Sequence, residues 1–469
     1  MKIRLYNARI LTMEENRPVF SGEIWIQDDR ILAVKESGQT EKIRQERDAQ
    51  DRSTCQYNSQ NQLAQEGYRE NIEGSQCNPS ILQERAAGIQ WDQEIDCGQN
   101  LLMPGFKNAH THSPMTFLRS YADDLPLQEW LQQKVFPLEA RLDEESIYWF
   151  GKLAVLEYLS GGITGIFDMY IRPDVMARVA MDTGIRCTLV SGLNDFTSSI
   201  EGQEEEYIRW NRAHPLVRYH LGCHAEYTCS RKLLEELSGL AQKFRAPVFL
   251  HLSETEKEVR ECEERYGMTP VKFLDSLGLF DNGGGGYHCI YLDREDKEIF
   301  LKRGLYAVTN PASNLKLASG IAPLAEYDLL GIPVAIGTDG AASNNCLDMF
   351  REMFLVSGLA KYREGDASAL DARKVLRMAT VNGARAMGWE DADVLAEGKL
   401  ADLILIDLRQ PNMQPIHNIP KNLVYSGNRS NVVMTVVGGK ILYSKGEFFL
   451  GSTPEEIYRE CDRCLKKIL

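Results

Sequence analysis

The stretch Met103-Pro104-Gly105-Phe106-Lys107-Asn108-Ala109-His110-Thr111-His112 decides how the rest of the chain is interpreted. It follows a strand start expected from Ile95 to Met103, and Pro104-Gly105 marks a sharp turn. Side chains two positions apart on an extended strand point to the same side. His110 and His112 can therefore direct both imidazoles at one ion. An isolated His-X-His pair often has no such role, so the interpretation depends on further ligands downstream.

Three later apolar runs also lead into a polar side chain that can bind a metal or move a proton. They carry His251, His288 and Asp339. Helical patterns separate these runs from one another. Polar groups at the carboxyl ends of successive strands, with helices between them, are what a (β/α)₈ barrel needs to build a site at one face. The pattern therefore predicts an α/β barrel.

Four motifs together resemble the metal-dependent amidohydrolase superfamily: HxH at 110 and 112, HLSE at 251 to 254, His288, and GTDG at 337 to 340. More closely, the set is similar to the methylthioadenosine/S-adenosylhomocysteine deaminase family, near the s-triazine chlorohydrolase group. The resemblance covers about residues 1 to 35 and 95 to 450. It implies a (β/α)₈ TIM barrel with a small β-sandwich domain formed by both chain ends.

Strand patterns at the two ends of the chain agree with this arrangement. We expect residues 1–104 to form the first part of the β-sandwich, 105–394 the catalytic barrel, and 395–469 the second part of the sandwich with a C-terminal helix. Residues from 36 to about 94 are rich in Gln, Glu, Arg and Asn and too polar to fold alone. They are either a solvated insertion or an arm that contacts another subunit or partner.

The composition is that of an ordinary globular protein. Of 469 residues, 43% are hydrophobic and 26% charged, and the net charge of −14 argues against a nucleic-acid partner. No stretch approaches the roughly 20 apolar residues of a membrane span, and the N-terminal stretch shows no apolar signal core. Eleven scattered cysteines suit a reducing compartment. We expect a cytoplasmic protein without a membrane partner.

The resemblance implies four metal ligands: His110, His112, His251 and Asp339. Three imidazoles and a carboxylate suit a divalent ion such as Zn²⁺, and Fe²⁺ also fits. Binuclear relatives add a bridging lysine carbamate on the fourth strand, which here ends in Gly222-Cys223-His224-Ala225-Glu226 without a lysine. We therefore expect one ion, which would lower the pKa of a bound water.

Catalytic roles for Glu254, His288 and Asp339 also follow from the resemblance. Glu254 would carry a proton from the attacking water to the purine N1, while His288 acts as a base and Asp339 assists. Such roles need groups that titrate near neutrality. Alone, Glu254 would be interpreted as a surface carboxylate and His288 as a core residue; the complete set of motifs favours catalysis.

The resemblance implies six substrate contacts: Glu139, Arg186, His224, Glu254, Asp339 and Trp130. Glu139 matches a glutamate that binds ribose hydroxyls, with a solvated acid as the alternative. Arg186 matches an arginine that contacts the distal part of the substrate, with a structural ion pair as the alternative. His224 matches a histidine of the family's site, and Trp130 either lines the mouth of the site or packs.

We therefore predict a metal-dependent aminohydrolase that deaminates 5′-modified adenosines such as S-adenosylhomocysteine and 5′-methylthioadenosine, with unmodified adenosine as a further candidate substrate. Another ring amidohydrolase, such as a guanine or 8-oxoguanine deaminase or an s-triazine chlorohydrolase, is the alternative, because fold and metal site do not fix the substrate. A non-catalytic assembly protein on this scaffold would be expected to have lost ligands. The resemblance also implies a homo-oligomer, either a dimer or a tetramer.

Overall fold

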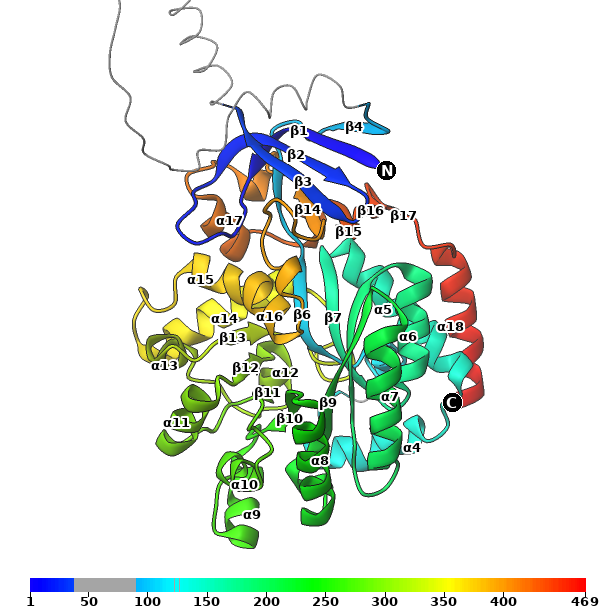
Figure 1. The fold of residues 1–469 in the computed structure, drawn as a ribbon, viewed down its shortest axis with the longest axis vertical. Coiled ribbons are helices and arrows are strands. Elements are labelled where there is room, and N and C mark those ends of the chain that lie inside the picture. Colours follow the sequence, from blue (N-terminus) through cyan, green and yellow to red (C-terminus); the bar gives the residue numbers. More distant parts are fainter. Residues whose placement is uncertain (38–89, 122, 126) are drawn as a thin grey trace, which may run out of the picture.

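The computed structural model describes residues 1–37, 90–121, 123–125 and 127–469 (Figure 1). The polar insertion predicted at about 36–94 lies mostly outside the described residues. Figure 1 shows a small sheet from both chain ends above a larger barrel. None of the helices in the described ranges is long and apolar enough to cross a membrane.

The barrel is an eight-stranded parallel sheet in which the strands follow one another in chain order from β6 to β13. Neighbouring strands pair in parallel register. The predicted TIM barrel is therefore confirmed. The strands are β6 (Phe106–Thr111), β7 (Ile163–Tyr170), β8 (Arg186–Ser191), β9 (Val217–Ala225), β10 (Val248–Leu252), β11 (Gly284–His288), β12 (Tyr306–Thr309) and β13 (Val334–Ile336).

Backbone and side-chain bonds join the first and last barrel strands. The amide of Asp339, just beyond β13, donates to the carbonyl of His110 at 3.0 Å. Below it, the amide of Thr338 donates to Oδ1 of Asn108 at 2.8 Å, and Nδ2 of Asn108 donates to Oγ1 of Thr338 at 2.7 Å. This seam brings predicted ligands from the two ends of the barrel sequence into contact.

Helices surround the barrel, and side-chain caps explain where most of them begin. Asp143, for example, accepts the amide of Ser146 at 2.8 Å and caps the start of α5. The larger helices are α5 (Glu144–Ser160), α6 (Pro173–Thr183), α7 (Ile200–Ala213), α8 (Arg231–Phe244), α9 (Glu256–Tyr266), α10 (Pro270–Ser276), α11 (Arg294–Arg303), α13 (Leu324–Leu330), α14 (Met349–Glu364) and α15 (Ala372–Arg377). Shorter ones are α3 (Leu127–Trp130), α4 (Phe136–Glu139), α12 (Pro311–Lys316) and α16 (Gly383–Ala386).

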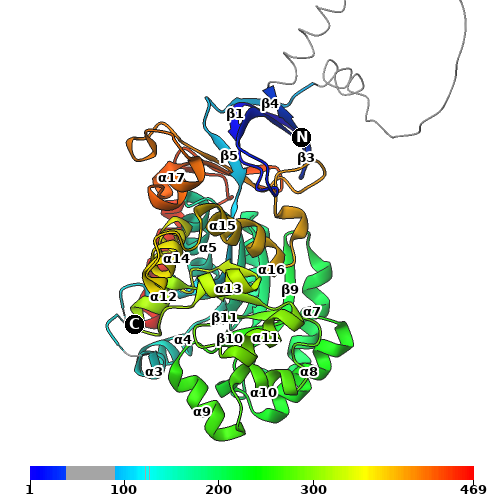
Figure 2. The ribbon, with the colours of Figure 1, turned by 90° about the vertical axis from the view of Figure 1, so that its left-hand side faces the viewer.

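The chain ends form one hydrogen-bonded sheet in the order β17-β16-β15-β14-β5-β1-β2-β3, with β4 paired to β1. Figure 2 shows this sheet curling above the barrel. Its members from the N-terminal part are β1 (Lys2–Ile10), β2 (Phe20–Gln27), β3 (Arg30–Glu36), β4 (Gln93–Asp96) and β5 (Leu101–Pro104). Those from the C-terminal part are β14 (Leu403–Ile406), β15 (Val432–Val437), β16 (Lys440–Ser444) and β17 (Glu447–Phe448).

The segment expected as one strand start from Ile95 to Met103 is interrupted. Its backbone turns between β4 and β5, where Gly98 and Gln99 both have positive φ. Because β5 pairs with β1 on one side and with β14 on the other, it joins the two chain ends into a continuous sheet. The small domain is confirmed, and its strands share one hydrogen-bonding path.

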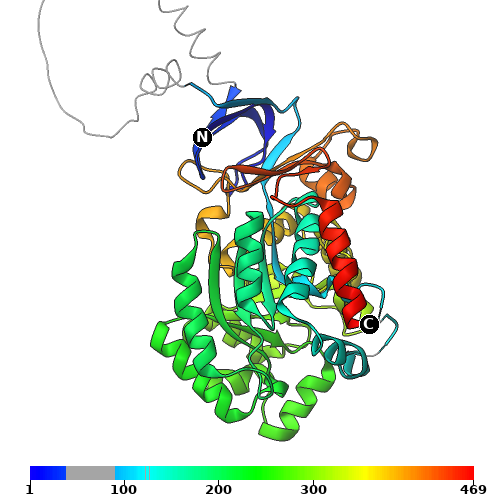
Figure 3. The ribbon, with the colours of Figure 1, turned by 90° about the vertical axis from the view of Figure 1, so that its right-hand side faces the viewer.

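Two helices near the C-terminus complete the molecule. The helix α17 (Ile419–Tyr425) lies beside the small sheet, whereas α18 (Pro454–Ile468) runs down the side of the barrel (Figure 3). Sγ of Cys461 in α18 donates to the carbonyl of Trp149 in α5 at 3.4 Å. The C-terminal helix is therefore docked on the barrel.

The interior of the barrel is packed with side chains, so it provides a floor for a site and not a channel. Phe167, Phe249 and Tyr287 are among the buried residues of this cluster, and Trp389 contributes from beyond the last barrel strand. The ring of Tyr287 stacks on the imidazole of His110 with 3.8 Å between centroids. The packed interior therefore supports the first histidine of the predicted site.

Candidate active site

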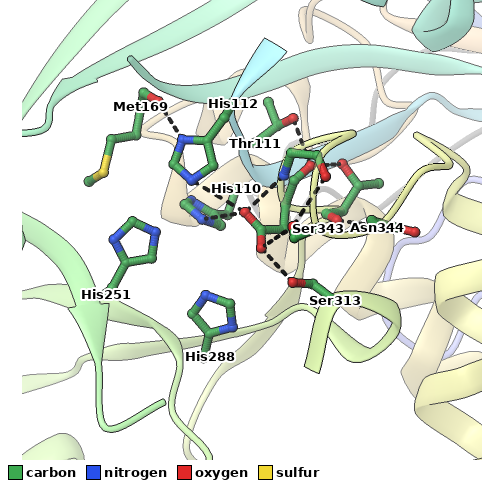
Figure 4. A network of polar contacts seen from close by, with 12 residues as sticks. His110, Thr111, His112, Met169, His251, His288, Ser313, Ser343 and Asn344 are labelled. Atoms are coloured by element: carbon green, nitrogen blue, oxygen red, sulfur yellow. Dashed lines mark hydrogen bonds and ion pairs between the residues drawn. The ribbon is translucent and has the colours of Figure 1, made fainter. Parts of the chain in front are cut away.

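Three predicted ligands converge above this floor. One ligand atom from each of His110, His112 and His251 lies within 4.8 Å of the others. The centroids of the His110 and His112 rings are 4.8 Å apart, and those of His110 and His251 are 4.9 Å apart. Figure 4 shows these imidazoles, with that of His288, around a common space. Residues distant in sequence therefore form one cluster.

Backbone carbonyls fix the orientation of two of these rings. Nδ1 of His112 donates to the carbonyl of Met169 at 2.5 Å, and Nδ1 of His251 donates to the carbonyl of His224 at 2.7 Å. A carbonyl can only accept, so both rings carry a proton on Nδ1, and Nε2 is the nitrogen that can bind a cation once it is unprotonated. Both are thus prepared to bind a cation through Nε2.

The imidazole of His110 is completely buried, and within the described part of the chain neither of its nitrogens has a hydrogen-bond partner. A buried polar group without a partner is costly unless something else satisfies it. A divalent ion shared with the two neighbouring histidines would satisfy it. Three imidazole donors at these separations fit such an ion.

Asp339 lies beside two of the three histidines. Its Oδ1 is 3.5 Å from Nε2 of His110 and 3.3 Å from Nε2 of His112. Its Oδ2 accepts hydrogen bonds from Ser313 at 2.6 Å and Ser343 at 2.7 Å. One oxygen is therefore held by hydroxyl groups, while the other faces the imidazoles.

Glu254 and His288 face each other next to the cluster. Oε2 of Glu254 is 3.8 Å from Nε2 of His288, and its Oε1 accepts from Oγ of Ser319 at 3.0 Å. Nδ1 of His288 lies 2.7 Å from Oδ1 of Asn314, an acceptor, so the ring carries its proton there. This leaves Nε2 of His288 facing Glu254. A carboxylate and an imidazole nitrogen thus lie together beside the histidine cluster.

Glu139 and His224 also lie near the histidine cluster. Oε1 of Glu139, at the end of α4, is buried, and the described residues offer it no hydrogen bond. Burial raises the pKa of Glu139 to about 7, while the Tyr170 hydroxyl and, to a smaller extent, His112 oppose the rise. The ring of His224 is 4.9 Å from that of His251, and burial lowers the pKa of His224 to about 4. Both side chains remain predicted substrate contacts.

Arg186 is placed elsewhere, and its predicted substrate contact is wrong. It is the first residue of β8 and therefore lies at the opposite end of the barrel from the histidines. Its Nε and Nη2 donate to Oδ2 and Oδ1 of Asp402 at 2.6 and 2.8 Å, and its side chain is 2% exposed. The alternative of a structural ion pair is what the structure contains.

Trp130 is 5% exposed and packs in the large hydrophobic cluster between the barrel and its helices. This burial favours the packing alternative given for it. A contact between Trp130 and a substrate stays a prediction.

Several polar residues that touch the predicted site residues had no assigned role. Those on the β12 and β13 loops are Ser313, Asn314, Ser319 and Ser343. The loop at 310 to 320 was predictable as a site loop from its Ser, Asn and Gly content after a strand. The individual partners were not, since nothing in the sequence pairs a given serine with a given carboxylate.

The fold and the site together define a metal-dependent hydrolase barrel with three histidines, an aspartate and an adjacent glutamate–histidine pair. Residues 101–442 match the Amidohydrolase family. The chain belongs to this family.

Individual relatives narrow the comparison further. The chain is 42% identical to a 5-methylthioadenosine/S-adenosylhomocysteine deaminase of Moorella thermoacetica, over 81% of this chain and 90% of that protein. It is 38% identical to a 5′-deoxyadenosine deaminase of Methanopyrus kandleri, over 81% and 89% of the two chains. A crystal structure of an adenosine deaminase from Xanthomonas campestris with bound zinc matches with a TM-score of 0.85 and 30% identity, covering 100% of this chain and 98% of that one.

Proposed function

We propose that this protein deaminates 5′-modified adenosines by hydrolysis, releasing ammonia and the inosine analogue. The observation that carries the proposal is the position of Glu254 and His288 beside the three-histidine cluster, 3.8 Å from each other. Relatives at about 40% identity that are named for such substrates support it.

His110, His112 and His251 would hold a single divalent ion, with Asp339 as the fourth ligand, and we propose Zn²⁺. Such an ion lowers the pKa of a bound water toward neutrality. The zinc in the related adenosine deaminase structure supports this choice over Fe²⁺. Metal analysis of the purified protein distinguishes the two, and a content near one ion per chain is expected.

The proton transfers follow from the side chains. The attacking water adds its oxygen to C6 of the adenine ring while Glu254 takes one water proton and passes it to N1. The Nε2 lone pair of His288 accepts the second proton, assisted by Asp339. As the C6–N bond breaks, the amino group takes the proton that His288 had accepted and leaves as ammonia, and the ring keeps the water oxygen at C6 and the proton at N1.

Glu139 supports a ribose-bearing substrate. Within the described residues its buried Oε1 accepts no hydrogen bond, and ribose hydroxyls are donors of the kind that would supply one. A bound nucleoside would satisfy this oxygen, whereas a free base would leave it unpaired. His224, whose ring is 4.9 Å from that of His251, would add a further substrate contact.

Ammonia release from metal-analysed protein tests the proposal. The panel contains S-adenosylhomocysteine, 5′-methylthioadenosine, 5′-deoxyadenosine, adenosine, guanine, 8-oxoguanine and a chloro-triazine. We expect turnover of the 5′-modified nucleosides, a loss of about 10²–10⁴-fold in kcat for Glu254→Gln with metal content unchanged, and a raised KM for Glu139→Gln. Turnover restricted to a free base or to a triazine would refute the proposed substrate class.

We also propose that the protein is a homo-oligomer, either a dimer or a tetramer, as its resemblance to the family implies. Light scattering coupled to size-exclusion chromatography measures the mass directly. A monomer at micromolar concentration would contradict this expectation without affecting the proposed chemistry.

A further inference from the structure

A buried carboxylate on α14 lies behind the site without a role in the chemistry described above. The side chain of Glu352 is 0% exposed, although it belongs to a helix on the outside of the barrel. A buried carboxylate is costly unless its oxygens are hydrogen-bonded. The partners of this one therefore indicate what it stabilises.

Each oxygen of Glu352 holds a different loop. Oε2 accepts the backbone amide of Ala312, in the first turn of α12, at 3.1 Å. Oε1 accepts Nδ2 of Asn344, in the turn that follows β13, at 2.8 Å. The same Nδ2 also donates to the carbonyl of Thr338 at 2.7 Å, which ties that turn to the end of β13.

The two loops deliver the hydrogen bonds that orient Asp339 and His288. Next to Ala312, Ser313 donates to Oδ2 of Asp339 at 2.6 Å and Asn314 accepts from Nδ1 of His288 at 2.7 Å. Next to Asn344, Ser343 donates to the same Oδ2 at 2.7 Å. Figure 4 shows Ser313 and Ser343 in this network.

Burial disfavours the charged form of Glu352, and its two hydrogen bonds offset part of that penalty. Burial raises the pKa of Glu352 to about 8, whereas the amide of Ala312 and the side chain of Asn344 oppose that rise. Both partners are donors, so the geometry is complementary to two accepting oxygens. A side chain with one accepting atom can hold only one of the two loops.

We propose that Glu352 is a positioning residue for the hydrolytic reaction, because it fixes the β12 and β13 loops to each other and thereby orients Asp339 and His288 together. This inference rests on the proposed function, because the rate is measured with a nucleoside substrate. It predicts an effect on the chemical step and on metal retention, since Asp339 is the proposed fourth ligand. Substrate affinity should change little.

The variant Glu352→Gln tests this role, because glutamine keeps the size but has only one accepting atom. We expect kcat to fall about 10–100-fold with KM within about threefold of the wild type, the range found for residues that orient metal ligands and catalytic groups. Zinc retention against a chelator should fall about tenfold or more. When Glu352→Gln is combined with Ser313→Ala and Ser343→Ala, the losses of kcat should be less than additive, because all of these changes weaken the same hydrogen bonds to Asp339.

Asp296→Asn is the matched control. Asp296 is also 0% exposed and also joins two segments, accepting Oγ1 of Thr269 at 2.5 Å and the amide of Asp293 at 3.0 Å, but it does so at α10 and α11. The variant Asp296→Asn should lower stability as much as Glu352→Gln while keeping kcat and zinc retention near wild type. An equal loss of kcat in both variants would show that Glu352→Gln acts through general destabilisation.

Other outcomes remain decisive. A folded Glu352→Gln protein with wild-type kcat and zinc retention overturns the proposal. If that variant does not fold, Asn344→Ala removes only the β13 anchor, and wild-type kcat and zinc retention in it would overturn the proposal equally. Wild-type protein that turns over no nucleoside refutes the proposed function instead, and zinc retention alone then decides the role of Glu352.

Discussion

The ion pair at the base of the barrel allows a sharp test of whether Arg186 belongs to the fold or to the substrate site. Arg186 and Asp402 make two hydrogen bonds of 2.6 and 2.8 Å, and both side chains are buried. At such a separation a unit charge pair is worth about 6 kcal/mol at an effective dielectric constant of about 20. Desolvation offsets part of this, and breaking a buried pair by removing one partner typically costs about 3–5 kcal/mol.

We expect Arg186→Met to lower stability by about 3–5 kcal/mol because it leaves the Asp402 carboxylate without its main partner. An unfolding entropy of about 2.1 cal/mol/K per residue gives roughly 1 kcal/mol/K for a 469-residue chain, so the melting temperature should fall by roughly 3–5 °C. Differential scanning fluorimetry at matched protein concentration measures this. The KM for 5′-methylthioadenosine should stay within about twofold of wild type, since the arginine lies at the other end of the barrel.

Two further variants separate the pair from general effects. Arg294→Met breaks an ion pair with Glu298 in which the arginine is 91% exposed, and should change the melting temperature by less than about 1 °C. Asp402→Asn combined with Arg186→Met should cost less than the sum of the single losses, because the unpaired charge is removed. A raised KM with an unchanged melting temperature in Arg186→Met would refute this reasoning and return the arginine to the substrate site.

Two other predictions concern buried polar groups. Burial lowers the pKa of Lys107, which donates to Oγ1 of Thr164 at 2.6 Å, from 10.5 to about 8. Between those two pH values the unfolded chain holds a proton that the folded protein has released, so the stability of the wild type relative to Lys107→Met should rise with pH. The rise should reach about 3 kcal/mol in denaturant titrations. A difference in unfolding free energy that stays constant from pH 7.5 to 10.5 would contradict this. Asn314→Ala removes the acceptor that holds the proton on Nδ1 of His288, so the proton can move to Nε2 and kcat should fall about 10–100-fold at unchanged zinc content. Asn314→Asp restores an acceptor and should recover part of the loss. Equal kcat in the wild type and both variants would show that the tautomer does not matter.

The sequence predicted which side chains lie together where each of them follows a strand end, whereas their roles stay predictions. His110, His251 and His288 each follow an apolar run, and the carboxyl ends of parallel strands meet at one face of a barrel whatever the intervening helices do. The strand patterns expected at the two chain ends are also present, as in β1 (Lys2–Ile10), because the alternation of side chains identifies a strand without tertiary information.

Arg186 shows how a motif can mislead when its place along the strand is ignored. Arg186 is the first residue of β8 and therefore lies at the amino-terminal end of that strand. A barrel site is built at the carboxyl-terminal end, so the position contradicted the role. What the sequence could not supply was the partner, because Asp402 is 216 residues away and enters from the small sheet.

Glu352 was unpredictable for a different reason. It lies near the start of a helix that also carries Arg351, Lys361 and Arg363, where an acid is ordinarily interpreted as part of a solvated face. Only the packing of α14 against the β12 and β13 loops removes it from water. Its importance depends on partners from two other loops, and no local pattern encodes that.

The closing seam of the barrel explains why motifs at opposite ends of the barrel sequence predicted fold and site together. Asp339 donates its amide to the carbonyl of His110, and Oγ1 of Thr111 donates to the carbonyl of Asp339 at 3.1 Å. The contacts that join β13 to β6 are thus made by the same residues, or their neighbours, that face the candidate ion. His110 and Asp339 cannot come within 3.5 Å of each other until this seam forms, so barrel closure and assembly of the site are a single structural event.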